Sequence, residues 1–234
     1  MKKVVLFFAV VFSILNSNAQ NKTKKSAAGL QTPRDSFSYA VGMNFANYCQ
    51  QQGITDLNFD AMLRAFDDIY NKKSLLLTNE EANMSVQIKL QEYREQKAKL
   101  AKEAGASFLS QNKVKSGVKS LPSGLQYQVL KSGDPNGLKP VAIDTVVVDY
   151  VGTLIDGTEF DNSLKRGEPA TFPLNGVIPG WTEILQYMTV GSKWKVFIPY
   201  ELAYGERGAG STIPPYSTLI FEINLREIKP ATVK

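Results

Sequence analysis

The fold of this chain is decided by DYVGTLIDGTEFD, residues 149–161, and by FPLNGVIPGW, residues 172–181. The first segment has the pattern of a strand rich in β-branched and aromatic residues that ends in an Asp-Gly turn. The second leads into a short amphipathic stretch, and LAYG (202–205) and IPPYSTLIF (213–221) follow it. Aromatic residues recur in all four segments, at strand and helix positions where such side chains are usually part of a core.

Strand-like segments surround these motifs. Alternating or β-branched patterns predict strands over 125–130, 145–154, 193–199 and 218–228, separated by Gly, Asp and Pro. A short helix is expected over 180–188, with its apolar side chains inward: Trp181, Ile184, Leu185 and Met188. Residues 116–234 are therefore expected to form an α+β domain, a mostly antiparallel sheet wrapped on one short helix.

Upstream of this domain the hydrophobic period is helical. A first helix is expected from about Asp35 to Gly53, with one apolar face: Phe37, Ala40, Val41, Phe45 and Tyr48. A second helix fits residues 58–71. Thr78 and Glu81 form a capping box that begins a third helix, which extends to about Asn112 and would be about 50 Å long.

The three helices carry short apolar stripes, which would make a thin core within one chain. Residues 34–115 are therefore expected to be an all-helical dimerisation domain with a long stalk helix, in which two chains share one core. The alternative is a small monomeric helical domain followed by a spacer helix.

The first residues have the pattern of a signal peptide. Lys2 and Lys3 precede the apolar run Val4–Leu15, and Ser17-Asn18-Ala19 supplies small residues for cleavage after Ala19. We expect an exported, periplasmic protein, loosely associated with the outer membrane if at all, with a disordered leader over 20–33 and no transmembrane span after signal removal. An uncleaved anchor is the alternative.

Composition excludes several classes of chemistry. The chain has no histidine and one cysteine, Cys49, which excludes Ser-His-Asp and Cys-His catalysis, Cys-cluster and His-ligated metal sites, and an internal disulfide. Cys49 is expected to be a half-buried helix residue. Basic residues are interspersed with acids, unlike a nucleic-acid-binding face. Neither a cofactor nor a metal is expected.

The motifs between 148 and 221, in their order and spacing, resemble the FK506-binding-protein family of peptidyl-prolyl cis–trans isomerases, and the resemblance covers residues 116–234. In the helical half, SYAVG (38–42), LTNEE (77–81) and the long helix look like the dimerisation domain of exported two-domain isomerases of the macrophage infectivity potentiator type. The resemblance implies a homodimer with two catalytic domains held apart.

Carried over position by position, the resemblance also implies a site. The groups acting on the twisted prolyl amide would be the Asp161 carboxylate, the Tyr204 hydroxyl, the Ile178 backbone N–H and the Phe221 ring. The substrate-binding residues would be Tyr150, Phe160, Phe172, Val177, Trp181 at the pocket floor, and Ile213. Each of these aromatics, taken alone, would more often be an ordinary core residue.

Three positions depart from the family pattern at the pocket rim: Ala170, Ala209 and Thr212. They bear on substrate preference and on affinity for an FK506-like macrolide, a ligand that the resemblance implies. The expected function is isomerisation of X–Pro bonds during the folding of exported polypeptides, without nucleophile or metal. The alternative is a chaperone that holds unfolded clients with little catalysis.

Overall fold

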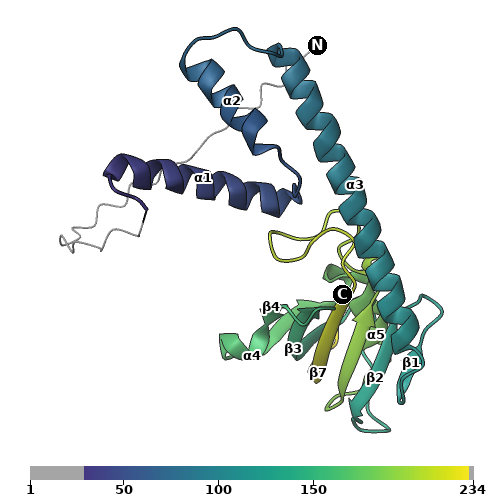
Figure 1. Ribbon diagram of the computed structural model, residues 1–234. Coiled ribbons are helices and arrows are strands. Elements are labelled where there is room, and N and C mark those ends of the chain that lie inside the picture. The colour runs from purple at the N-terminus through teal and green to yellow at the C-terminus, as the bar shows by residue number, and fades with distance from the viewer. Residues whose placement is uncertain (1–28, 232–234) are drawn as a thin grey trace, which may run out of the picture. The chain divides into compact units, whose positions relative to one another are not determined.

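A computed structural model describes residues 29–231 of the chain (Figure 1). The predicted signal peptide and most of the predicted leader lie outside these residues. Within them, no helix combines the length and apolar character needed to cross a membrane. Contacts divide the chain into a unit that ends at Gln50 and a unit that begins at Gln51, and each is described by itself.

Helix α1 (Pro33–Gln52) begins slightly before its predicted start because a polar cap precedes it. The Thr32 hydroxyl accepts from the Asp35 N–H at 3.1 Å, and the Asp35 carboxylate accepts from the Thr32 N–H at 2.8 Å. Gly53, with φ of 77°, follows the last residue as predicted. The apolar side chains of α1 are exposed, Phe37 by 71% and Phe45 by 46%, whereas Cys49 is fully buried rather than half-buried.

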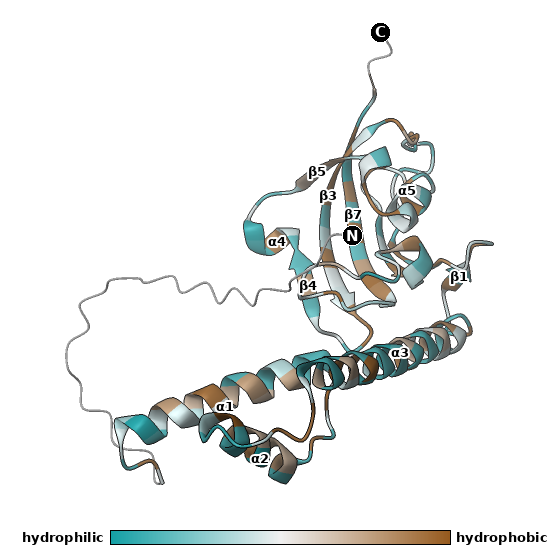
Figure 2. Ribbon diagram, turned by 90° about the horizontal axis from the view of Figure 1, so that it is seen from above, coloured by the Kyte–Doolittle hydropathy of each residue, from teal (hydrophilic) through white to brown (hydrophobic). Residues whose placement is uncertain are grey.

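Helices α2 (Phe59–Tyr70) and α3 (Asn79–Asn112) confirm the predicted spans. Asn58 caps α2 by accepting from the Ala61 N–H at 3.0 Å, and the predicted capping box begins α3. The apolar stripe of α2 is open to solvent, with Phe59 and Leu63 exposed by 65% and 62%. Hydrophobic residues run along α1 and α2 in Figure 2. Among the described residues before Leu125, Cys49 is the only buried apolar side chain.

The second unit also contains one antiparallel sheet of seven strands in the described range. They are β1 (Val118–Ser120), β2 (Gln126–Lys131), β3 (Thr145–Leu154), β4 (Glu159–Asn162), β5 (Ala170–Pro173), β6 (Lys193–Ile198) and β7 (Leu219–Lys229). The order is β1-β2-β6-β7-β3-β4, with β5 paired to β3. The α+β prediction is confirmed, and the four long strands lie where the sequence pattern placed them.

Helix α5 (Pro179–Leu185) covers the apolar face of the sheet. Its predicted inward residues Trp181, Ile184 and Leu185 are buried, as is Met188 just beyond it. A Cβ on Gly180 would lie 2.5 Å from the Ile198 Cγ2 atom, so a glycine at this position lets α5 approach β6 closely. The core thus fixes α5, which carries Trp181, against the sheet.

The end of α3 is fastened to the sheet by buried polar contacts. Asn112 is 1% exposed, and its side-chain amide donates to the Gln126 Oε1 at 3.0 Å. The Gln126 amide in turn donates to the Leu109 carbonyl at 2.9 Å. One turn earlier, Phe108 packs on Phe197 with ring centroids 5.9 Å apart. Helix therefore gives way to sheet between Asn112 and Val118, and the predicted domain boundary at residue 116 stays a prediction.

Candidate active site

A cavity of about 400 Å³ opens beside α5. The structure brings all ten sequence-predicted site residues to its wall: Tyr150 from β3, Phe160 and Asp161 from β4, Phe172 from β5, Val177 and Ile178 before α5, Trp181 from α5, Tyr204 and Ile213 from the loop after β6, and Phe221 from β7. Gly176 and Thr212 also line it. Residues far apart in the sequence meet here because β3, β4, β5 and β7 are neighbours in one sheet.

Trp181, 4% exposed, lies at the centre of the aromatic wall. Its ring meets those of Tyr150, Phe172 and Phe221 edge-on, with centroids 5.0, 5.7 and 5.2 Å away. Phe160 meets Phe221 in the same way at 5.5 Å. Edge-to-face packing is the arrangement that aromatic quadrupoles prefer, so the rings hold one another in place. The result is a rigid, largely apolar wall.

Gly152 makes this wall possible. A Cβ at this position would lie 2.6 Å from the Phe160 ring and 2.9 Å from the Phe221 ring. Any larger residue would displace one ring or the other, since real Cβ contacts are never so short. The glycine in the YVG motif therefore has a packing reason that the sequence alone did not reveal.

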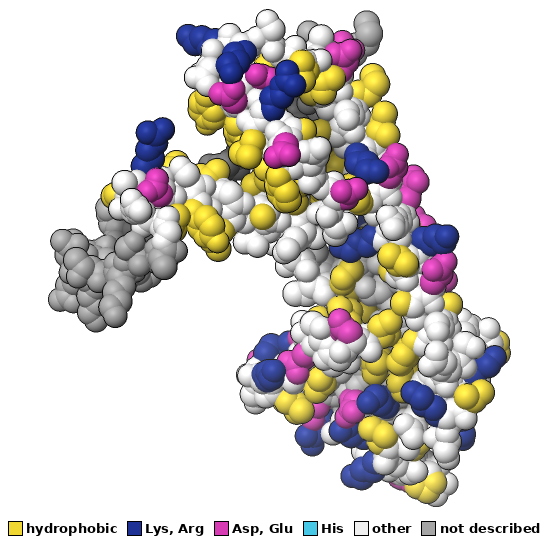
Figure 3. Space-filling model, in the orientation of Figure 1, with side chains coloured by type: hydrophobic (Ala, Val, Ile, Leu, Met, Phe, Trp, Pro, Cys, Tyr) yellow, Lys and Arg dark blue, Asp and Glu magenta, His cyan; other side chains and the backbone are white. Residues whose placement is uncertain are grey.

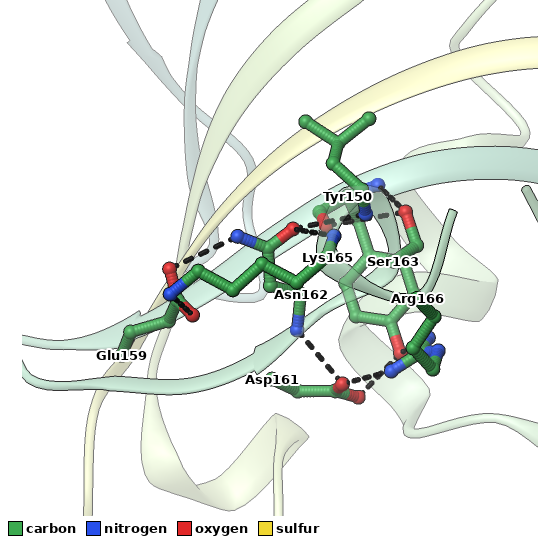
Figure 4. Close-up of polar contacts among 8 residues, drawn as sticks. Tyr150, Glu159, Asp161, Asn162, Ser163, Lys165 and Arg166 are labelled. Atoms are coloured by element: carbon green, nitrogen blue, oxygen red, sulfur yellow. Dashed lines mark hydrogen bonds and ion pairs between the residues drawn. The ribbon is translucent and has the colours of Figure 1, made fainter. Parts of the chain in front are cut away.

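Tyr150 and Asp161, which both line the cavity, belong to a polar network (Figure 4). The Tyr150 hydroxyl donates to one carboxylate oxygen of Asp161, and Arg166 forms an ion pair with the other. Arg166 also donates to the Tyr150 hydroxyl at 3.0 Å, and its guanidinium lies 5.5 Å from the centre of the Tyr150 ring. The Asn162 N–H donates to Asp161 at 2.8 Å. The carboxylate is therefore held by three donors.

Sequence reasoning missed Arg166. It ends the four-residue helix α4 (Ser163–Arg166), which is capped by Asn162 and followed by Gly167 at φ of 83°. This tight turn carries the guanidinium back to a carboxylate five positions earlier in the chain. A helix of one turn has no hydrophobic period, so no pattern in the sequence announced it.

The network fixes the charge of each group. Burial raises the pKa of Asp161, but the hydrogen bonds from Tyr150 and Arg166 outweigh burial, and the net pKa lies below the ordinary value of 3.8. Burial raises the pKa of Tyr150, and donation to Asp161 raises it further. Burial and the negative charge of Asp161 likewise raise the pKa of Tyr204. At neutral pH the carboxylate is ionised and both phenols are protonated.

These directions predict a flat pH profile. Since Asp161 titrates below its ordinary range and the tyrosines above theirs, kcat/KM should stay within about twofold between about pH 5 and 9. Activity should fall only in acid, where Asp161 is protonated through its lowered pKa. Protonation there also removes the stability that the hydrogen bonds of the ionised carboxylate give the folded state. Exchange spectroscopy by NMR on an X–Pro peptide measures this without a coupling protease. A break near pH 6 or 7 would contradict the assignment of charges.

Two backbone and loop features complete the wall. The Ile178 carbonyl accepts from the Trp181 and Thr182 N–H groups at 2.9 and 3.1 Å, and its own N–H has no acceptor among residues 29–231. Tyr204 also lines the cavity and is 40% exposed. In the same range no cluster of three or more His, Cys, Asp or Glu side chains could hold a metal ion. The site offers donors, one fixed anion and apolar surface.

Comparison with known proteins identifies the family. Residues 137–226 match the family of FKBP-type peptidyl-prolyl cis–trans isomerases, and residues 34–129 match the domain amino terminal to such isomerases. The outer membrane protein MIP of Legionella longbeachae is 42% identical over 236 residues, covering 98% of this chain and 99% of that protein. The chain belongs to the FKBP-type peptidyl-prolyl cis–trans isomerases.

Two further FKBP-type proteins share this two-part organisation. FkpA of Aeromonas hydrophila, itself named an isomerase, is 43% identical over 93% of this chain and 85% of its own length. The crystal structure of FkpA from Escherichia coli superposes with a TM-score of 0.67 at 37% identity, covering 86% of this chain and 99% of that one. The resemblance inferred from the motifs is thus confirmed, and the protein is an enzyme of this isomerase family.

Proposed function

We propose that the enzyme isomerises X–Pro bonds in the cavity around Trp181 by desolvating the prolyl amide. The rotation barrier of roughly 18–20 kcal/mol comes from amide resonance, which separates charge between oxygen and nitrogen in the planar form. The twisted form has less charge separation. A dry aromatic wall therefore destabilises the twisted form less than it destabilises the planar form. The observation that carries this proposal is the closed set of edge-on rings around Trp181.

The polar groups then select the twisted geometry. In this proposal the free N–H of Ile178 binds a substrate carbonyl, and the protonated Tyr204 hydroxyl donates to the chain next to the rotating bond. Asp161 has both oxygens engaged by Tyr150 and Arg166, so it acts as a fixed negative charge and holds the Tyr150 ring in the wall. No bond is made or broken, and no group needs to change its protonation state.

A pair of matched phenylalanines tests this assignment. Phe221 on β7 and Phe197 on β6 are both buried, 3% and 5% exposed, but only Phe221 lines the cavity. Phe221→Leu should lower kcat/KM by about tenfold or more, since it removes a ring that contacts substrate and holds Trp181. Phe197→Leu should leave kcat/KM within about twofold at a comparable loss of thermal stability. If the two variants lose activity equally, the cavity is not the site.

We propose, further, that the enzyme is exported and acts on proline-containing polypeptides folding outside the cytoplasm. The predicted signal peptide supports this location, as does the name of the Legionella relative, an outer membrane protein. An FK506-like macrolide should compete with peptide for the same cavity, because its walls are apolar. Inhibition of the wild type in the isomerase assay measures that competition.

We also propose that the helical half forms a homodimer. The apolar side chains of α1 and those of α2 are exposed. Figure 3 shows hydrophobic side chains gathered over these helices. Covering such surface is favourable by roughly 25 cal/mol per Å², so helices of a second copy are the natural partners. Binding of unfolded clients by the same surface is the second candidate, which the exposed Leu75, Leu76 and Leu77 before α3 favour.

A further inference from the structure

The loop from Tyr204 to Tyr216 carries part of the cavity wall as one closed unit. At its base, the Tyr216 N–H donates to the Gly205 carbonyl at 2.9 Å. Within it, Ala209 and Ile213 exchange backbone hydrogen bonds of 2.8 and 3.1 Å. Ile213 is 6% exposed and lines the cavity together with Thr212. Because the loop is tied internally, its position depends on what holds its base.

Tyr216 holds that base in an unusual conformation. Its φ is 60°, a left-handed value that non-glycine residues seldom adopt, and Lys72 is the only other such residue in the described range. The Tyr216 ring lies edge-on to Tyr200 with centroids 5.3 Å apart. A backbone conformation of this kind persists only when surrounding contacts determine it.

A cation from the stalk helix completes those contacts. The Lys102 Nζ lies 4.2 Å from the centre of the Tyr216 ring and 6.0 Å from that of Tyr200. Lys102 belongs to α3, outside residues 137–226 that match the isomerase family. Helix α3 packs closely against Thr218 here, since a Cβ on Gly105 would lie 2.5 Å from the Thr218 Oγ1 atom. This close packing fixes the helix. The ammonium group is therefore presented to the loop by a rigid support.

We propose that Lys102 is a positioning residue for prolyl isomerisation: from α3 it fixes Tyr216, and through Tyr216 the loop that bears Ile213. The inference rests on the proposed assignment of the cavity as the site. The alternative is that Lys102 is a solvent-exposed lysine that does not affect the position of the loop. The geometry favours the first role, since Nζ lies well within the roughly 6 Å at which a cation is attracted to an aromatic face.

The test compares charge-matched variants of the full chain. Lys102→Gln should raise KM for an X–Pro peptide about two- to fivefold with kcat nearly unchanged, because Ile213 contacts substrate in the ground state and the transition state alike. Lys102→Arg keeps a cation over the ring and should restore KM. Lys99→Gln removes the same charge from α3, where Lys99 pairs with Glu103 and with no other acid in the described part of the chain, and should change nothing.

A structural readout accompanies the kinetics. In a methyl NMR spectrum the Ile213 δ1 signal should shift in Lys102→Gln and return in Lys102→Arg, while the core Ile184 signal stays in place. Unchanged KM and Ile213 signal in Lys102→Gln, or an equal effect of Lys99→Gln, would overturn the inference. Failure of this inference can be told apart from failure of the proposed site. If the site is wrong, Phe221→Leu leaves kcat/KM unchanged, whatever the result for Lys102→Gln.

Discussion

Replacement of Asp161 by alanine is expected to lower kcat/KM for an X–Pro peptide by about tenfold to a hundredfold. The variant leaves the Tyr150 hydroxyl and the Arg166 guanidinium without their shared acceptor and removes the fixed negative charge beside the cavity. A hydrogen bond to a charged group contributes about 1.5–3 kcal/mol, and each 1.4 kcal/mol corresponds to a factor of ten in rate. Isomerisation rates of the purified full chain measure the loss.

Two further variants separate charge from shape and site from fold. Asp161→Asn keeps the volume and one acceptor oxygen, so its loss should be smaller than that of alanine. Asp149→Asn is the matched control, because the buried Asp149 carboxylate pairs with the exposed Arg226 away from the cavity. It should lower thermal stability and leave kcat/KM within about twofold. An Asp161→Ala enzyme with wild-type kcat/KM, or an Asp149→Asn enzyme equally impaired, would count against the assigned role.

The elements that the sequence predicted are those long enough to show a period. The ten residues of β3 and the eleven of β7 alternate or carry β-branched runs, and α3 has a capping box at its start. By contrast β1, β4, β5 and α4 have three or four residues each. The short strands form because longer strands pair with them. These contacts come from the tertiary structure, so the local sequence pattern does not predict them.

The candidate site was predictable to a similar degree and for a different reason. Its ten residues came from motifs in a recognised order, and the structure places all ten around one cavity. Arg166 and Lys102 escaped because their partners are set by geometry: one lies at the end of a single helical turn, the other on a helix outside the matched isomerase region. Charged residues at exposed positions carry no sequence signal of the ring or carboxylate that they meet.

The helical half shows the limit of reasoning from burial in one chain. The stripe spacing predicted a thin core, and the structure has a still thinner one, since Cys49 is the only buried apolar residue described before Leu125. The N-termini of α1, α2 and α3 are nevertheless all capped by side chains. The exposed apolar stripe of α2 is the surface that the proposed homodimer would cover.

Substitution of Leu63 by glutamate should convert the protein from dimer to monomer. Leu63 is 62% exposed on the apolar stripe of α2, next to Phe59 and Phe66. In a shared core the new carboxylate would be buried without a partner, at a cost of several kcal/mol, which raises the dissociation constant by a hundredfold or more. Sedimentation velocity at micromolar concentration should show twice the chain mass for the wild type and the single mass for Leu63→Glu.

Ala61→Glu is the matched control, because it adds the same charge to the polar face of α2 in its first turn, where an acid is favourable. This variant should remain dimeric, and both variants should isomerise a short peptide at the wild-type rate, since the cavity residues all lie between Tyr150 and Phe221. A wild type that sediments as a monomer would refute the dimer. Suppose that the monomeric wild type suppresses aggregation of an unfolded client and that Leu63→Glu does not. The exposed stripe would then be a client-binding surface, and the chaperone function would take precedence for this half of the chain.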